Sequence, residues 1–191
     1  IIMKRKSVKR YQRYFFDICV SLIILLLFAD LRDDKATNKQ IIRERFHIHI
    51  DFKVFINGQE MDFSLPQYNE KDRRIHLHTE NDFGGNVVHI EDERVGLREF
   101  FSSLGMAITD ECFSTTNETF CNNQNKRLKF YVNGKRTSVA DYRISDSDRI
   151  LISYGNETEE MIEKQLGSVT NLACVFSSKC EIPEELNIVT L

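Results

Sequence analysis

Strict alternation of apolar and polar residues marks three short segments of the chain, residues 46–58, 75–79 and 87–91. A period of two is typical of β-strands that bury one face and leave the other polar. In the first segment one parity is apolar and consists of Ile48, Ile50, Phe52, Val54 and Ile56. The opposite parity carries His47, His49, Asp51 and Lys53. We therefore predict a sheet with one core face and one polar face.

All five histidines of the chain lie in these segments, and all fall on the polar parity. They are His47, His49, His76, His78 and His89. Residues two apart on a strand share a face, and opposite residues on neighbouring strands have Cβ atoms about 5 Å apart. Two His-x-His strands side by side would therefore bring up to four imidazoles within reach of one ion. If the two strands are separated in the sheet, the cluster splits into pairs.

Imidazole nitrogen is a good ligand for copper and zinc, and a carboxylate of the same parity can add an oxygen ligand. We therefore predict a copper or zinc site with ligands drawn from His47, His49, His76, His78, His89 and Asp51. Two other interpretations stay open. The histidines could lie on an ordinary solvent-exposed sheet face, or they could form a surface that responds to pH.

Turn and helix signals fill the space between and after these strands. Asn57-Gly58 predicts a hairpin whose returning strand covers residues 61–65. Residues 96–105 predict a short helix with its apolar residues on one face and a glycine cap at its end. A strand over residues 128–133 and a closing strand over residues 150–154 follow. Asn156 and Glu159 then form a plausible cap for a helix over residues 157–166.

Together these elements predict an α+β fold, in which one helix packs on a mixed sheet. The order of hairpin, helix, strand and closing strand is similar to the β-grasp plan, a resemblance of architecture that does not fix function.

The N-terminal residues differ in character from the predicted domain. Residues 1–13 are basic, and residues 14–29 are apolar except for Asp17 and Ser21. A basic flank before an apolar segment predicts a single-pass anchor with a cytoplasmic N-terminus and an exported C-terminal part, and a cleaved signal peptide is the alternative. We expect residues 30–45 to be a tether, residues 46–155 the exported α+β domain, and residues 156–191 a C-terminal helix and tail.

Cysteine usage and charge narrow the functional classes. Outside the apolar segment, four cysteines fall in two local pairs, Cys112 with Cys121 and Cys174 with Cys180. In an exported domain these predict two structural disulfides, although four cysteines allow three pairings. The net charge of the 191 residues is only −3. With basic and acidic residues interspersed after residue 30, we expect no nucleic-acid partner.

Residues 46 to about 165 resemble a family of membrane-anchored proteins from ammonia-oxidising archaea and related lineages. The shared motifs are Phe46-His47-x-His49, Asp62-Phe63-Ser64, Ile75-His76, residues 85–89, residues 97–106, Cys112-Phe113, Cys121, residues 131–134 and residues 148–158. The resemblance implies histidine at positions 47, 49, 76 and 89, whereas a carboxylate can replace His78. Many members carry the label protein-disulfide isomerase.

The isomerase label implies thiol-disulfide exchange as an alternative activity. That chemistry is typical of Cys-x-x-Cys motifs, and this chain has none. The chain also lacks Gly-x-Ser-x-Gly, a phosphate-binding glycine loop and His-Glu-x-x-His. We therefore expect a non-catalytic metal-binding domain, with a thiol-disulfide enzyme and a metal-free assembly module as alternatives. The sequence identifies no protein partner.

Overall fold

The computed structural model describes residues 16, 18–24, 46–69, 71–77 and 85–181. The chain divides into two compact units, Ile1–Arg45 and Phe46–Leu191. In the first unit residues 18–24 are helical, and several large apolar side chains there are exposed. Among the described residues, no helix is both long and apolar enough to cross a membrane. Half of the predicted anchor, residues 14–29, lies outside the described residues, as does the whole of the predicted tether.

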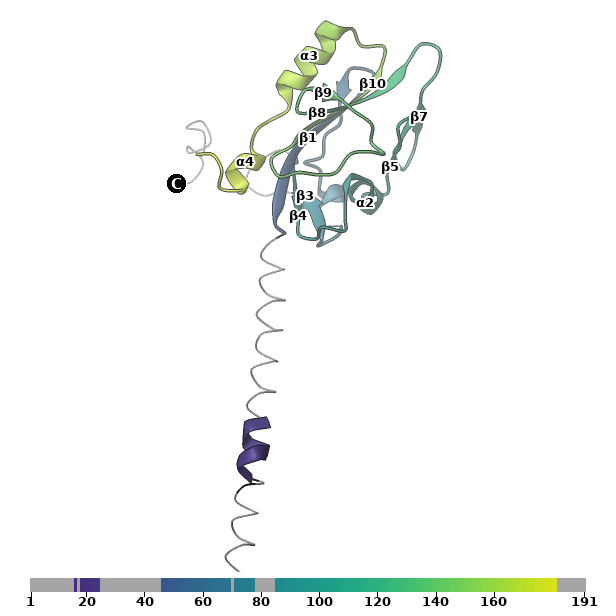
Figure 1. The fold of residues 1–191 in the computed structure, drawn as a ribbon. Helices are drawn as coiled ribbons and strands as arrows, with labels where there is room; N and C mark the ends of the chain where they lie inside the picture. The colour runs from purple at the N-terminus through teal and green to yellow at the C-terminus, as the bar shows by residue number, and fades with distance from the viewer. Residues whose placement is uncertain (1–15, 17, 25–45, 70, 78–84, 182–191) are drawn as a thin grey trace, which may run out of the picture. The chain divides into compact units, whose positions relative to one another are not determined.

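The second unit contains a mixed seven-stranded sheet, a small antiparallel sheet and several helices (Figure 1). The main sheet consists of β1 (Ile48–Ile56), β2 (Gln59–Glu60), β3 (Ile75–Leu77), β4 (Val87–Ile90), β8 (Arg127–Val132), β9 (Lys135–Arg136) and β10 (Arg149–Gly155). The small sheet consists of β5 (Ala107–Ile108), β6 (Cys112–Ser114) and β7 (Thr119–Cys121). The helices are η1 (Pro66–Tyr68), α2 (Leu97–Ser103), α3 (Glu159–Ser168) and α4 (Ala173–Phe176). The predicted α+β class with a mixed sheet is confirmed.

The strand order of the main sheet is β3-β4-β1-β10-β8-β9, and β2 pairs with the end of β1. The two central strands, β1 and β10, are parallel neighbours. The pairs on either side of them, β1 with β4 and β10 with β8, are antiparallel. Strand β1 therefore lies in the middle of the sheet, so that both of its faces need a covering layer.

One face of the sheet packs against α2, as the alternation predicts. The apolar parity of β1 is buried there together with Val88 and Ile90 of β4 and with Ile150 and Ile152 of β10. From α2 the chain contributes Leu97, Phe100 and Phe101, all buried. The Glu99 carboxylate accepts a hydrogen bond from the Gly96 backbone N–H at 2.9 Å and so caps the start of this helix. The helix predicted over residues 96–105 is confirmed.

The predicted turn at Asn57-Gly58 is also present, but the strand after it is shorter than expected. Asn57 and Gly58 have φ angles of 52° and 79°, which is the left-handed pair that a type I′ hairpin requires. The returning strand β2 covers Gln59–Glu60, so the prediction of a strand over residues 61–65 is wrong. The Asp62 carboxylate accepts hydrogen bonds from the Ser64 N–H and hydroxyl, and this local turn takes the chain away from the sheet.

The second face of the sheet, which the sequence predicts to be polar, is covered by the C-terminal segment. Helices α3 and α4 lie on one side of the sheet and α2 on the other (Figure 1). Under α3 a second small core contains Phe55, Leu151, Ile162 and Val169. The expectation of a single helix on the sheet is therefore wrong. The apolar Phe55 and Leu151 stand on the polar parity, and they draw α3 onto this face.

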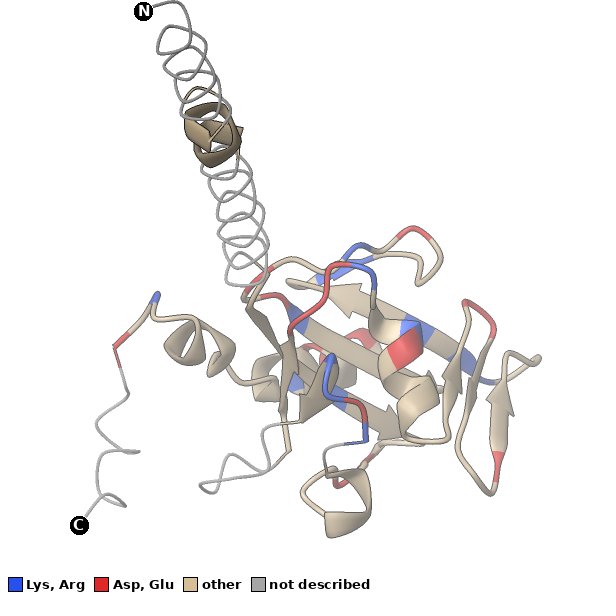
Figure 2. Cartoon of the chain, turned by 90° about the horizontal axis from the view of Figure 1, so that it is seen from below, with Lys and Arg blue, Asp and Glu red and all other residues tan. Residues whose placement is uncertain are grey.

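Helix α3 begins two residues later than the sequence suggests. Thr158, and not Asn156, is its N-cap, and its hydroxyl accepts a hydrogen bond from the Met161 N–H. Glu157 lies before the helix, where its buried carboxylate pairs with the Lys129 ammonium at 2.7 Å. This ion pair fixes the chain direction as it leaves β10. Elsewhere along the described chain, acidic and basic residues are interspersed (Figure 2).

Candidate metal centre

Strand order decides which histidines can meet. The sequence left open whether the two His-x-His segments are neighbouring strands, and the structure separates them, because β4 lies between β1 and β3. His89 of β4 is therefore the central residue, and it is opposite His49 on one side and His76 on the other. The three residues form a row across the three strands on the face away from α2. Antiparallel pairing places side chains of one row in direct contact.

Three imidazoles approach closely enough to share one ion. One ring nitrogen from each of His47, His49 and His89 lies within 4.8 Å of the others. The ring centroids of His47 and His89 are 4.4 Å apart, and those of His49 and His89 are 4.6 Å apart. His49 and His89 are buried, whereas His47 is exposed. The cluster therefore has a buried base on the sheet and one ligand at its entrance, and it could hold a metal ion.

His49 is held by contacts from two loops that are distant in sequence. Its backbone N–H donates to the Asp146 carboxylate at 2.8 Å, and its Nδ1 lies 3.1 Å from the Ser177 hydroxyl. The Ser177 hydroxyl also lies 2.6 Å from the Asp146 carboxylate. The ring of Phe176 packs against the His49 ring, with 5.5 Å between centroids. His49 is thus held through both its backbone and its ring.

Asp146 is in a setting that favours its charged form. Partial burial raises the pKa of its carboxyl, but hydrogen bonds from Lys179, Ser177 and the His49 backbone outweigh that effect. The net result is a pKa below the usual value for aspartate. A carboxylate thus stands one hydroxyl away from an imidazole of the cluster, which is an arrangement that proteins use around metal-bound histidines.

The other two predicted histidines are placed differently. His76 packs against His89 with ring centroids 4.8 Å apart, but it does not belong to the group of three. It stands on the far side of His89 from His49. His78 lies outside the described residues. The structure therefore brings together three of the five predicted imidazole ligands.

Asp51 shares the parity of His49 but serves another purpose. Its fully buried carboxylate accepts hydrogen bonds from the Leu172 N–H at 3.0 Å, the Ala173 N–H at 2.8 Å and the Thr170 hydroxyl. Burial raises its pKa above the usual value, although these three donors and the charge of Arg149 act in the opposite direction. The structure does not bring Asp51 into the histidine cluster. It uses this carboxylate to hold the start of α4.

Arg149 completes this attachment from the neighbouring strand. It is opposite Asp51 in the parallel pair, and its guanidinium donates to backbone carbonyls at the end of α3, among them Thr170 at 3.0 Å. Asp51 and Arg149 thus bind the two ends of the α3–α4 connection to the sheet. This attachment places the loop after α4 next to His49.

Sequence reasoning missed Asp146 and Ser177, and the reason is distance along the chain. Ser177 is 128 residues from His49, and no local pattern links them. A partial signal did exist in β10, where Ile150, Leu151 and Ile152 are consecutive apolar residues. A continuous apolar run is typical of a strand that is buried on both faces. That run could have predicted a cover on the histidine face, although not the residues that provide it.

Both predicted disulfides are present. Cys112 and Cys121 join opposite positions of β6 and β7, with Cα atoms 4.1 Å apart. Cys174 and Cys180 close a loop that begins in α4. Within the described residues Cys19 is the free cysteine. The two bridges enclose short loops and so restrict the unfolded chain.

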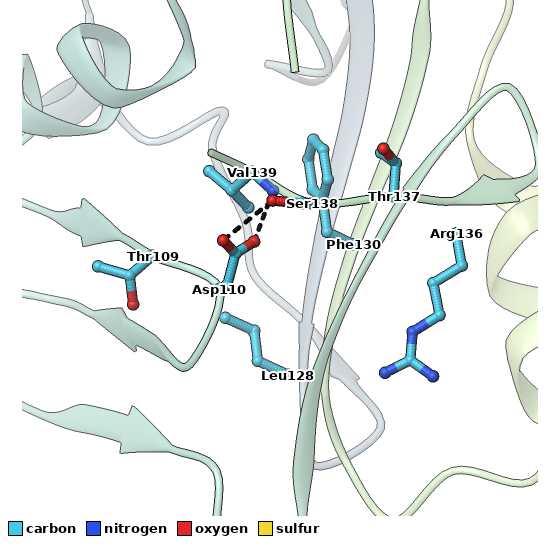
Figure 3. A pocket seen from close by; sticks show the side chains of 8 residues that line it. All are labelled: Thr109, Asp110, Leu128, Phe130, Arg136, Thr137, Ser138 and Val139. Carbon is cyan, nitrogen blue, oxygen red and sulfur yellow. Dashed lines mark hydrogen bonds between the residues drawn. The ribbon is translucent and has the colours of Figure 1, made fainter. Parts of the chain in front are cut away.

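A separate cavity of about 410 Å³ is lined by residues of β8, by the turn between β5 and β6 and by the loop that follows β9. Its polar centre is Asp110, whose carboxylate accepts hydrogen bonds from the Ser138 hydroxyl at 3.0 Å and the Val139 N–H at 2.7 Å (Figure 3). Each oxygen of this carboxylate therefore holds the loop that follows β9. The lining residues include neither imidazole nor thiol, so the histidine cluster is the better candidate for chemistry.

Searches against protein-family models, curated proteins and solved structures find no match to this chain. Fold and site together define a disulfide-bonded α+β domain with a histidine cluster that could hold a metal ion. We therefore infer the chemistry of the site from the residues of this chain alone.

Proposed function

We propose that this chain is a membrane-anchored, extracytoplasmic domain that binds one copper or zinc ion without catalysing a reaction. The role would be storage, sensing or delivery of the metal. The observation that carries the proposal is the meeting of His47, His49 and His89, with one ring nitrogen of each within 4.8 Å of the others.

The ligand set favours copper or zinc over harder ions. Three neutral imidazoles suit zinc and copper, whereas magnesium and calcium prefer oxygen ligands. A tetrahedral zinc site with bonds of about 2.0–2.1 Å places its ligand nitrogens about 3.4 Å apart. Small side-chain rotations would bring the three nitrogens to that spacing. A fourth position would stay open at the exposed side of His47, through which metal could enter and leave.

Three observations support an exported and anchored location. Two disulfides are typical of proteins in oxidising compartments. Basic residues precede an apolar segment in the sequence, which favours a cytoplasmic N-terminus. The helix of residues 18–24 exposes large apolar side chains, among them Ile18, Leu22 and Ile23. We also propose that the main sheet, with its central parallel pair and antiparallel neighbours, is β-grasp-like. We further propose that the chain is a member of the archaeal family that its motifs resemble.

Metal titration of the chain with copper and zinc tests the proposed function. We expect one ion per chain with sub-micromolar affinity. At a free metal concentration one hundred times the dissociation constant, binding should stabilise the fold by about 2.7 kcal/mol. The His47→Gln variant should fold normally, because His47 is exposed, and should bind metal much more weakly.

His76→Gln is the matched control, since it removes an imidazole that touches His89 but lies outside the group of three. This variant should retain most of the affinity. Equal and weak binding by the unmodified chain and both variants would contradict the proposal and leave the histidines as a structural feature.

A further inference from the structure

The disulfide-closed loop of residues 174–180 contacts His49 of the histidine cluster through two of its side chains. Phe176 packs on the His49 ring, and Ser177 lies within hydrogen-bond distance of both His49 and Asp146. Lys179 pairs with the other oxygen of the Asp146 carboxylate at 2.7 Å. These contacts reach His49 and its partner Asp146 without providing a ligand. They are therefore placed to control His49.

The donors around Asp146 determine where the Ser177 proton lies. The Oδ1 atom of Asp146 accepts from the His49 backbone N–H, and its Oδ2 atom faces the Lys179 ammonium. Both of these partners can only donate. The carboxylate therefore acts as an acceptor at both oxygens, and the Ser177 hydroxyl must donate its one proton to Oδ1. At 2.6 Å this is a short, charge-assisted hydrogen bond.

The position of that proton fixes the state of the His49 ring. The Ser177 oxygen has used its hydrogen, so toward Nδ1 of His49 it can only accept. Nδ1 must then carry the ring proton and donate across the 3.1 Å separation. In a neutral imidazole the other nitrogen, Nε2, holds the lone pair. Nε2 is therefore the atom with which His49 can ligate a metal.

We propose that Ser177 is a positioning residue of the histidine site: the relay from Asp146 through Ser177 holds His49 in the tautomer that presents Nε2 as the metal ligand. The consequence for the metal rests on the proposed function, whereas the tautomer does not. Partners that bind the second nitrogen of a ligating histidine raise its basicity and fix its ring, and their loss typically costs about 10- to 100-fold in metal affinity. The metal is of the imidazole-binding class, copper or zinc.

Architecture explains why a serine so far along the chain can do this. Asp51 fixes the start of α4 on the sheet, and the Cys174–Cys180 disulfide closes the loop directly after it. Inside the loop the Lys179 and Cys180 N–H groups both donate to the Cys174 carbonyl. The loop is thereby held from its base and closed on itself, and it presents Ser177 to His49.

The first test needs no metal. In the metal-free chain labelled with nitrogen-15 in histidine, imidazole nitrogen shifts report which ring nitrogen of His49 is protonated. We expect the Nδ1–H form in the unmodified chain and a mixture of tautomers in Ser177→Ala. Ser177→Thr keeps the hydroxyl and should restore the Nδ1–H form. An Nε2–H tautomer in the unmodified chain, or no change in Ser177→Ala, would overturn the proposal.

The second test is the copper or zinc affinity of the same variants. Ser177→Ala should bind about 10- to 100-fold more weakly, and Ser177→Thr should recover most of that loss. Ser103→Ala is the matched control, because the Ser103 hydroxyl donates to the Phe100 carbonyl on α2, on the opposite face of the sheet. It should leave the affinity unchanged.

The two tests separate this proposal from the proposed function. If the tautomer follows Ser177 while the unmodified chain binds no metal, the positioning role stands and the metal-binding function fails. If the chain binds metal tightly and Ser177→Ala binds equally well with an unchanged tautomer, the function stands and the positioning role fails.

Discussion

The two faces of the central sheet are built by different means. The face under α2 is an apolar layer whose side chains come from alternating strand positions and from one helix that follows directly in sequence. The histidine face mixes a small apolar core with imidazoles, and its cover comes from the C-terminal segment through Asp51, Arg149 and Ser177. The first face is held by the packing of a large apolar area, and the second by a small apolar core and a few specific polar contacts. We therefore expect substitutions on the two faces to reduce the stability of the fold by different amounts and in different regions.

Removing a large side chain from the α2 face should have the largest effect. Phe100 is fully buried and touches Phe52 and Phe101, with ring centroids 5.3 Å and 5.1 Å away. Phe100→Ala should lower the free energy of unfolding by about 3–5 kcal/mol, because it removes apolar contacts and leaves a cavity. Chemical denaturation measures this loss. A change below about 1 kcal/mol would mean that the α2 face is not the main source of stability.

The same difference explains how much of the molecule the sequence predicts. The α2 face follows from the alternation in β1, and the Asn57-Gly58 turn and α2 follow from local signals. The histidine row also follows from parity, although its centre at His89 depends on strand order. The cover on that face does not follow, because Asp51 and Ser177 meet partners more than 100 residues away. Periodicity tells which face a side chain occupies, but not which distant segment will lie on it.

The histidine face should be most sensitive at Asp51. Asp51→Ala leaves the Leu172 and Ala173 N–H groups without their acceptor in a buried position. We expect a loss of about 2–4 kcal/mol in the free energy of unfolding, because buried donors lose their partner while already out of water. Hydrogen exchange should show that the α3–α4 region opens first while the α2 region stays protected.

Asp51→Asn is the control for this change, since its amide oxygen still accepts one of the hydrogen bonds. Its loss should be smaller. Uniform loss of protection on both faces in Asp51→Ala would show that the cover and the core unfold together, and the contrast between the faces would then be wrong.

The two disulfides allow a direct test of the histidine face, because both close short loops but only one of them lies next to the histidine cluster. The loops that they close span sequence separations of 9 and 6 residues. In the chain-entropy model each contributes about 2–3 kcal/mol. Removing either pair, with Cys112→Ser and Cys121→Ser or with Cys174→Ser and Cys180→Ser, should therefore lower the stability by similar amounts. Only the second pair should weaken copper or zinc binding, because only that loop carries Ser177. Equal affinities in the two double variants would contradict a role for the loop at the site.

The smallest expected effect is a pH dependence on the α2 side. Tyr142 packs against Phe130 and donates to the buried Asp148 carboxylate at 2.8 Å. Burial and the charge of Asp148 raise the pKa of Tyr142 well above its usual value. Above pH about 10 the unfolded chain releases the tyrosine proton and the folded chain keeps it. Stability should therefore fall with rising pH from about pH 10 by up to about 1.4 kcal/mol per pH unit.

Tyr142→Phe should lack this part of the slope, and the difference between the pH dependences of the unfolding free energy of the two chains across pH 9–11 measures it. Parallel curves would mean that the hydroxyl titrates alike in the folded and unfolded states, and that the polar contact with Asp148 contributes little to a face held by packing.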